Sequence, residues 1–449
     1  MSLWHLPAFL SACFDSCGAV LDKRSALRLP LLLLGSLLAK GRRTVTSWFR
    51  AAGITVDFRR YYSVLWAVGR RASSVAGCFF IGVVKPLMLR VCGDHLVFAL
   101  DDSPTKRFGP CIQGAGIHHN PTPGPAGEKF LYGHVWVTLA WLGKHPLCGV
   151  LALPLQAMLY IRAKDVEKLN KEYPEYRWQF RTKLELAVEL VLWLLRWLGN
   201  TGKAIWVVVD GGYAKAPFLR PLLKHGVTVF GRLRKDAGLR SLPPTERRKG
   251  QRGPMPTYGK QAISLAKRAG QKGGWREVVC TQYGRTVTKI VKAFQATWEP
   301  VGGAILVVLV KEQDGWLAFL CTDINASVES VLETMADRGA IEQTFKDVKE
   351  VWGAQQQQLR NVYACIGAFN INLWMDSIVE VWAWSAGEED VVDRRASPWD
   401  SEPRRPSHAD KRKALQREVF QGEFEAGLAG RPTKRDFRAL AGRLLDMAA

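Results

Sequence analysis

The sequence predicts an α/β protein with a mixed sheet flanked by helices, a helical N-terminal region and a β-rich insertion. Residues 182–198 repeat apolar side chains at helical spacing, which predicts an amphipathic helix. Residues 204–209 form a continuous apolar run, typical of a strand buried on both faces. Further strand-like runs lie between residues 94 and 153. Apolar residues make up 47% of the 449 positions, enough for a large core shared among several domains.

The N-terminal region, residues 1–90, is expected to be mainly helical. It contains two basic and aromatic stretches, 40–50 and 58–71, which Gly53 separates. This spacing is compatible with a helix-turn-helix-like unit. In one interpretation the unit contacts DNA, with Arg42 and Arg43 binding phosphates. In the other, the stretches are amphipathic helices with solvated charges, and the pattern is equally typical of both.

The central elements follow one another in the order strand, strand, strand, helix, strand, helix, strand. They are expected at residues 95–100, 133–142, 146–153, 182–198, 204–209, 214–224 and 227–231. This is the element order of an RNase H-like fold, a mixed sheet with helices on both sides. The alternative is a doubly wound α/β domain. That fold needs a helix between the first strands, where the sequence offers only a loop rich in Gly and Pro.

The second half begins with a basic segment, residues 232–275, and continues with strand-like runs at 276–282, 286–296, 303–310 and 315–321. We interpret this part as a β-rich insertion. Helix is expected from about residue 327 to 384, then a charged linker at 388–411 that contains Pro398, Pro403 and Pro406, then a small helical tail. The chain is thus divided into regions 1–90, 91–231, 232–326, 327–385 and 386–449.

The charge balance points to a polyanionic partner. Lys and Arg number 63 against 41 Asp and Glu, a net charge of +22, and nucleic acid is the commonest partner of such a protein. The sequence contains no apolar run of the roughly 20 residues that a membrane helix needs, and no signal peptide is recognisable. The nine cysteines form no CxxC pair, which favours reduced thiols in a cytoplasmic protein.

Acidic residues follow two of the predicted strands. Asp101 and Asp102 come after the run at 95–100, and Asp210 comes directly after 204–209. In open α/β sheets, functional groups gather at this edge. Two neighbouring carboxylates repel each other unless a cation neutralises them, and Mg²⁺ prefers such oxygen ligands. The alternative is that each aspartate merely begins a turn.

A third acidic residue lies in a predicted helix at residues 337–352. Arg338, Glu342 and Lys349 lie in one row of this helix, so a cation, a carboxylate and a second cation face the same way. Taken alone, Arg338 and Glu342 would be interpreted as a surface pair worth about 0.3–0.5 kcal/mol.

Together these residues resemble the DDE transposases of bacterial insertion sequences, in the branch with an inserted β domain. The spacing Arg338-x3-Glu342-x6-Lys349 matches the end of the family signature Y-x2-R-x3-E-x6-K, and Met335 replaces its Tyr. Asp101-Asp102-Ser103 resembles the first motif of the family, D-x-[ST]. The second, a strand-ending aspartate with small residues and Tyr, resembles residues 210–213.

The resemblance implies a metal-dependent endonuclease and strand transferase that moves a transposable element. Asp101, Asp210 and Glu342 would hold two Mg²⁺ ions, with Mn²⁺ as a substitute and Asp102 as the alternative to Asp101. The residues expected to contact DNA phosphates are Arg338, Lys349, Lys106, Arg107, Arg42 and Arg43. An aromatic residue of the insertion, here Trp298, would stack on a flipped base. The implied partners are double-stranded DNA (element ends and target) and a second copy of the chain, in the cytoplasm at the nucleoid and away from membranes.

Other interpretations of the acids are a catalytically inactive, transposase-derived DNA-binding protein and a different RNase H-like nuclease. All three carboxylates are present, which disfavours the first. The insertion and the row of Arg338, Glu342 and Lys349 disfavour the second. A carboxylate enzyme that processes carbohydrates or small molecules would explain the acids and leave the charge of +22 unexplained.

Overall fold

The computed structural model describes residues 4–120, 127–246, 253–392, 399, 405–428, 433–435, 437–438 and 441–442. Its N-terminal region is helical, as predicted. The helices are α1 (Ala8–Gly18), α2 (Lys23–Leu38), α3 (Val45–Ala51), α4 (Phe58–Arg70), α5 (Ala72–Phe79), the π-helical turn η1 (Phe80–Val84) and α6 (Lys85–Val91). Asp22 and Thr44 begin α2 and α3 by accepting hydrogen bonds from backbone N–H groups of the first turn.

The aromatic side chains of the two basic N-terminal stretches lie mostly in the core. Trp48, Phe49 and Tyr61 are at most 3% exposed. Helix α4 crosses the long helix α13 (Val362–Ala383) at a very short distance. A Cβ atom at Gly69 would lie 1.7 Å from the Tyr363 carbonyl oxygen, and one at Gly367 would lie 2.1 Å from the Leu65 oxygen. These helices therefore share one core with the rest of the protein.

The central region supplies the mixed sheet that the sequence predicts. Its elements are β1 (His95–Lys106), β2 (Gly116–His119), β3 (Phe130–His145), β4 (Gly149–Tyr160), α7 (Ala163–Glu172), the short turn η2 (Pro174–Tyr176), α8 (Lys183–Leu198), β5 (Ala204–Val209), α9 (Ala216–Leu223) and β6 (Thr228–Arg232). Strands β4, β3, β1, β5 and β6 lie side by side in that order, and only the β1–β5 and β5–β6 pairings among them are parallel.

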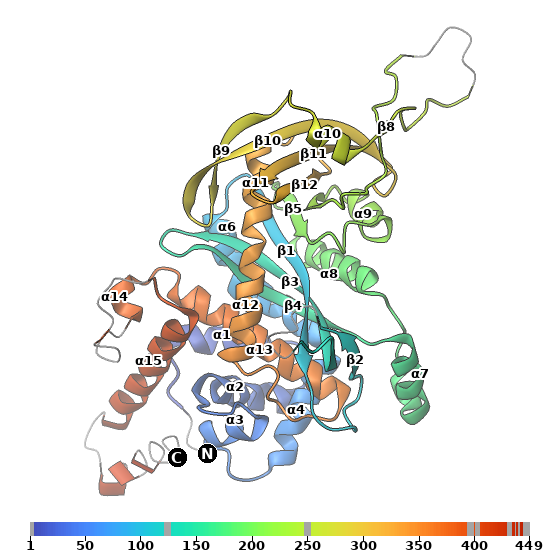
Figure 1. The fold of residues 1–449 in the computed structure, drawn as a ribbon. Coiled ribbons are helices and arrows are strands. Elements are labelled where there is room, and N and C mark those ends of the chain that lie inside the picture. The colour runs from blue at the N-terminus through green and yellow to red at the C-terminus, as the bar shows by residue number, and fades with distance from the viewer. Residues whose placement is uncertain are drawn as a thin grey trace.

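The β-rich insertion extends this same sheet. It consists of β7 (Leu239–Arg240), β8 (Ala262–Ile263), α10 (Leu265–Gly270), β9 (Arg276–Gln282), β10 (Arg285–Trp298), β11 (Gly303–Glu312) and β12 (Gly315–Cys321). Strand β12 pairs antiparallel with β6, so the insertion continues the sheet without a break. Figure 1 shows the insertion at one end of the sheet and helices α2, α3 and α4 at the opposite end of the molecule.

Strand β1 is longer than the sequence suggests, and the expectation that it ends at Asp101 and Asp102 is wrong. Its parallel pairing with β5 stops at Leu100 and Val209, but its antiparallel pairing with β3 continues as far as Lys106 and Gly133. Hydrogen bonds to β3 keep the backbone extended beyond the apolar run. The two aspartates therefore lie within a strand.

The C-terminal helices are α11 (Val328–Asp337), α12 (Gly339–Glu350), α13, α14 (Glu388–Val391) and α15 (His408–Leu428). The single helix expected at 327–384 is interrupted at Arg338 and again after Glu350, where Gly353 takes a positive φ of 68°. Helix α15 begins inside the predicted linker, and Pro398 and Pro403 of that linker lie outside the described residues.

Helix α13 owes its apolar composition to burial. Asn370, Trp374 and Ser377 form hydrogen bonds with backbone groups of β4 at Ala157, Leu155 and Pro154, and so cover the free edge of this strand.

By length and hydropathy alone, the helical stretches 72–91 and 362–383 would be long enough to cross a membrane, contrary to the sequence expectation. In the fold, 56% and 94% of their apolar windows are buried inside the protein.

The sheet separates two apolar layers. On one face Leu100 and Val209 pack with α8, α9, α13 and the N-terminal helices. On the other face Ala99, Val208 and Phe230 pack with α11 and α12. Figure 1 shows α12 lying across β1, β3 and β4 on this second face. Alternate residues of β1 therefore point into different surroundings.

Candidate active site

The register of the parallel strands brings Asp101 and Asp210 together. Leu100 pairs with Val209, so the two aspartates occupy the next position along neighbouring strands, about 5 Å apart at the backbone. Asp101 lies two residues after Ala99, which packs on the α12 side of the sheet. The Asp101 carboxylate therefore points toward α12.

Asp102 points to the opposite face, where other side chains neutralise it. Its Oδ2 lies 2.6 Å from Lys183 Nζ of α8, and its Oδ1 accepts a 2.8 Å hydrogen bond from the Tyr213 hydroxyl. Burial, together with Asp102, raises the pKa of Tyr213 well above its usual value, so this phenol stays protonated as a donor. These contacts favour Asp101 over Asp102 as the residue that faces Glu342.

Helix α12 brings the third carboxylate to the same place. Arg338, at the junction of α11 and α12, donates from one terminal nitrogen to Asp101 Oδ2 at 2.8 Å and from the other to Glu342 Oε1 at 2.8 Å. One guanidinium thus links two acids that lie far apart in the sequence. Glu342 is 61% exposed along its side chain whereas Asp101 is 18% exposed, so the acids extend from the sheet to the surface.

The Asp101 carboxyl is electrostatically unusual. Burial raises its pKa from 3.8 to about 6, Arg338 acts in the opposite direction, and Asp102 and Asp210 raise the pKa further. An acid in this setting favours a nearby cation, and in the structure the Arg338 guanidinium is that cation. Perturbed carboxyls of this kind are common at functional sites.

The carboxylates of Asp101, Asp210 and Glu342 fit a hard divalent cation by their chemistry, since all three offer oxygen ligands. Among the residues that the structure describes, however, no three His, Cys, Asp or Glu side chains converge closely enough to hold one metal ion. Arg338 lies between Asp101 and Glu342 and forms an ion pair with each, so its single positive charge is shared by two carboxylates. Arg338 would therefore have to leave Asp101 and Glu342 before their oxygens could hold a divalent cation.

The other predicted DNA contacts have different surroundings. Lys106 is exposed and pairs with Glu128 at 2.9 Å. Lys349 is half-buried, burial lowers its pKa, and within the described chain no carboxylate pairs with it. Arg107 is only 5% exposed and donates to His134 Nδ1 and to the Gln357 carbonyl. The structure thus contradicts a phosphate contact by Arg107, because its guanidinium is enclosed and already bonded.

The two arginines of the N-terminal basic stretch also differ from each other. Arg42 is exposed, whereas Arg43 is half-buried and donates to the Glu350 carbonyl. Its backbone N–H donates to Gln356 Oε1. Arg43 therefore joins the start of α3 to the end of α12, which leaves Arg42 as the more accessible cation.

The expected base-stacking role of Trp298 is wrong for this structure. Trp298 is 8% exposed and belongs to the main core. It lies at the end of β10, where it pairs with Gly303 on one side and Leu239 on the other. Its ring is packed between secondary-structure elements and offers no free face to a base.

Comparison with protein families decides the ancestry of the chain. A family model of DDE superfamily endonucleases matches residues 13–298. The chain belongs to this family. The match confirms the predicted resemblance to DDE enzymes, and the mixed sheet is consistent with the predicted RNase H-like fold, whereas the branch with the Y-R-E-K signature stays a prediction. It includes Asp101 and Asp210 and ends before Glu342. No curated protein matches the chain.

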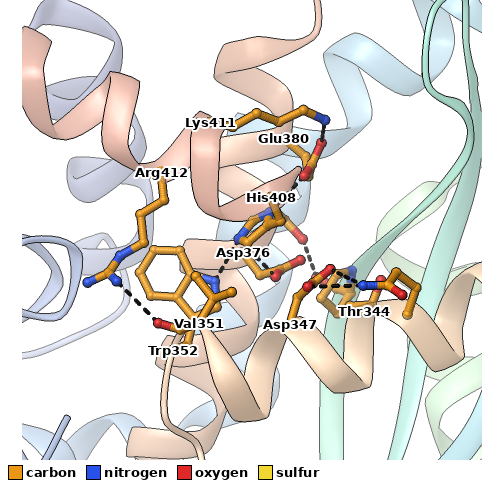
Figure 2. A network of polar contacts seen from close by, with 12 residues as sticks. Thr344, Asp347, Val351, Trp352, Asp376, Glu380, His408, Lys411 and Arg412 are labelled. Carbon is orange, nitrogen blue, oxygen red and sulfur yellow. Dashed lines mark hydrogen bonds and ion pairs between the residues drawn. The ribbon is translucent and has the colours of Figure 1, made fainter. Parts of the chain in front are cut away.

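The DDE superfamily membership leaves one charged cluster without an assigned role. On the other flank of α12, His408 of α15 lies between Glu380 Oε1, at 2.7 Å, and Asp376 Oδ1, at 3.1 Å, and Lys411 Nζ is 2.5 Å from Glu380 Oε2. Figure 2 shows these contacts beside Asp347 of α12. The two carboxylates of α13 raise the pKa of His408 although burial lowers it. The cluster attaches α15 to α13 through the contacts of His408 and Lys411 with Glu380.

Arg412 completes this attachment. It is 5% exposed and donates to the Ser36, Leu37 and Ala39 carbonyls at the end of α2 and to the Val351 carbonyl after α12. Helix C-termini carry unpaired carbonyls and partial negative charge, so one guanidinium satisfies both ends. Local sequence predicts only a linker and a small helical tail here, because the burial of His408, Lys411 and Arg412 depends on partners distant in the chain.

Proposed function

We propose that this DDE superfamily endonuclease is an insertion-sequence transposase. It would bind the ends of its element and catalyse Mg²⁺-dependent DNA cleavage and strand transfer. The observation that carries this proposal is the link from Asp101 through Arg338 to Glu342. It joins the end of the parallel strands, where Asp210 lies, to the helix with the Arg-x3-Glu-x6-Lys row.

The proposed chemistry uses Asp101, Asp210 and Glu342 to hold two Mg²⁺ ions, with Mn²⁺ as a substitute. Bound Mg²⁺ would make an attacking water or 3′ hydroxyl more acidic and would stabilise the leaving oxygen. Arg338, freed from the acids, and Lys349 would bind phosphate oxygens beside the cleaved bond. The exposure of Glu342 fits a polymeric substrate that approaches across the surface.

The proposed partners and regions follow from this chemistry. Double-stranded DNA would bind residues 1–90 through Arg42 and the catalytic regions 91–231 and 327–385, with Lys106 as a further backbone contact. Residues 232–326 form the insertion, and 386–449 carry the linker and the C-terminal helix. The protein would act as a homodimer that holds two element ends, in the cytoplasm at the nucleoid.

Cleavage of a plasmid that carries the DNA flanking this gene tests the proposal. Asp210→Asn and Glu342→Gln are expected to lose Mg²⁺-dependent strand cleavage while they retain DNA binding in a gel-shift assay. Glu350→Gln is the matched control, because Glu350 is an exposed acid of the same helix. Cleavage by both acid variants at the wild-type rate would overturn the proposal.

A further inference from the structure

A third parallel strand, β6, contributes a residue to the row that contains Asp101 and Asp210. Strand β6 lies parallel to β5, and Val209 pairs with Gly231. The positions that follow in register across β1, β5 and β6 are therefore Asp101, Asp210 and Arg232. Strand spacing is about 5 Å, so the Arg232 backbone lies about 5 Å from that of Asp210 and about 10 Å from that of Asp101.

The Arg232 side chain leaves the sheet on the side of the acids. It follows Phe230 by two positions, and Phe230 packs with Ala99 and Val208 on the α12 face. Gly211, directly after Asp210, lies against Arg232. A Cβ atom at Gly211 would be 3.1 Å from the Arg232 carbonyl oxygen and 3.7 Å from its Cβ atom. Arg232 therefore borders the turn that carries Asp210.

A groove of about 460 Å³ opens beside this turn. Its lining comprises Gly211, Arg232, Leu233, Arg234, Lys235 and Asp236. The Lys235 ammonium lies 5.2 Å from the centre of the Trp316 ring, a cation–π contact that holds it at the surface.

The cations of this groove are not equally available. Arg234 makes a two-bond ion pair with Asp236, at 2.9 Å for each bond. Across the part of the chain that the structure describes, neither Arg232 nor Lys235 has a carboxylate within ion-pairing distance. Two cations without a paired carboxylate attract an anion into the groove. The neighbouring carboxylates of Asp101 and Asp210 repel an anion, so the anion is expected beside the acid row and not within it.

We propose that Arg232, supported by Lys235, is a phosphate-binding subsite that positions the DNA strand next to the acid row. This inference rests on the proposed function. It adds the position on the protein where the phosphate backbone of the DNA strand would bind next to the acid row. The guanidinium offers a bidentate pair to a single phosphate, and the ammonium acts as a point charge on a neighbouring one. Arg232 is thus a positioning residue: it would bind a DNA phosphate and so place the cleaved bond at the acid row.

The test compares Arg232→Gln with Arg234→Gln on duplexes made from the DNA flanking this gene. Loss of a charged hydrogen bond is expected to lower the cleavage rate at subsaturating DNA by about 10- to 100-fold in Arg232→Gln. Arg232→Lys should recover part of the rate. Arg234→Gln should cleave like the wild type, because Asp236 already occupies its guanidinium.

Duplexes with one uncharged methylphosphonate near the cleaved bond distinguish loss of a phosphate contact from damage to the protein fold. The measured quantity is the cleavage rate of each duplex. At the contacted position the wild type should slow by the factor lost in Arg232→Gln, and the variant should not slow further. Equal rates for wild type and Arg232→Gln on every duplex would overturn the subsite. A slow Arg232→Gln variant that every methylphosphonate slows by the same factor as the wild type would also overturn the subsite. Inactive Asp210→Asn and Glu342→Gln variants alongside either result would leave the proposed function intact, whereas cleavage by both acid variants at the wild-type rate would overturn the function itself.

Discussion

Replacing Asp101 with asparagine is expected to abolish cleavage and at the same time stabilise the metal-free protein. The pKa of this carboxyl rises from 3.8 to about 6 on folding, chiefly through burial. One pH unit corresponds to about 1.36 kcal/mol, so the ionised group opposes folding by up to about 3 kcal/mol. Asparagine has a similar shape and carries no charge. It therefore removes this opposition together with a ligand atom for the metal.

The pH dependence gives the sign of the effect. Between pH 4 and 6 the unfolded chain has released the proton of Asp101 while the folded chain retains it, so wild-type stability falls as the pH rises through this window. Asp101→Asn should therefore exceed the wild type in free energy of unfolding by up to about 3 kcal/mol at pH 7. The two proteins should converge toward pH 4. Urea unfolding with EDTA at both pH values measures the difference, and EDTA prevents stabilisation by bound metal.

Asp102→Asn is the contrasting variant, because Asp102 accepts from Lys183 and Tyr213 on the other face of the sheet. Its loss leaves Lys183 without a counter-charge, which should cost about 1–3 kcal/mol of stability. Cleavage measured at a temperature where the variant is folded should persist. An Asp101→Asn protein less stable than the wild type at pH 7, or active while Asp102→Asn is inactive, would refute this reasoning.

Two further substitutions test the packing that supports the site. Gly69→Ala would gain about 1 kcal/mol from helix propensity, but its Cβ would lie 1.7 Å from the Tyr363 carbonyl. We therefore expect a net loss of about 1–3 kcal/mol in urea unfolding, whereas Gly270→Ala, with nothing within 4 Å, should not lose stability. A more stable Gly69→Ala would contradict the close crossing of α4 and α13. Arg412→Gln leaves several helix-end carbonyls unpaired and should lower the unfolding free energy by about 3 kcal/mol or more; an unchanged urea midpoint would show that Arg412 does not anchor α15.

Local sequence patterns predicted most elements, because the apolar pattern of a segment reflects which of its residues are buried. The runs at 204–209, 276–282 and 315–321 coincide with β5, β9 and β12. Pairing between distant segments decided the rest. Strand β1 continues past its apolar run because β3 supplies hydrogen bonds as far as Lys106. A helix start inside a charged, Pro-containing segment was not predictable, since α15 depends on acids of α13.

The candidate site shows the same division. Motif spacing together with the family resemblance selected Asp101 (with Asp102 as the alternative), Asp210, Arg338 and Glu342, because helix periodicity and acids that follow apolar runs are local features. Sequence did not reveal that Arg107 is enclosed, since exposure depends on the segments that cover a residue. It also missed Arg232, although a basic residue directly after a second parallel strand was a signal that could have found it.

The sequence by itself determined the order of most strands and helices and the basic character of the chain, and it predicted Asp210, Glu342 and one of Asp101 and Asp102 as the candidate acids. Only the tertiary structure decided which aspartate faces Glu342, because that depends on strand register and on which helices cover each face. It also decided that Arg338 forms ion pairs with two of the acids at once. Burial and pairing arise between residues that are more than 200 positions apart, and no local pattern encodes them.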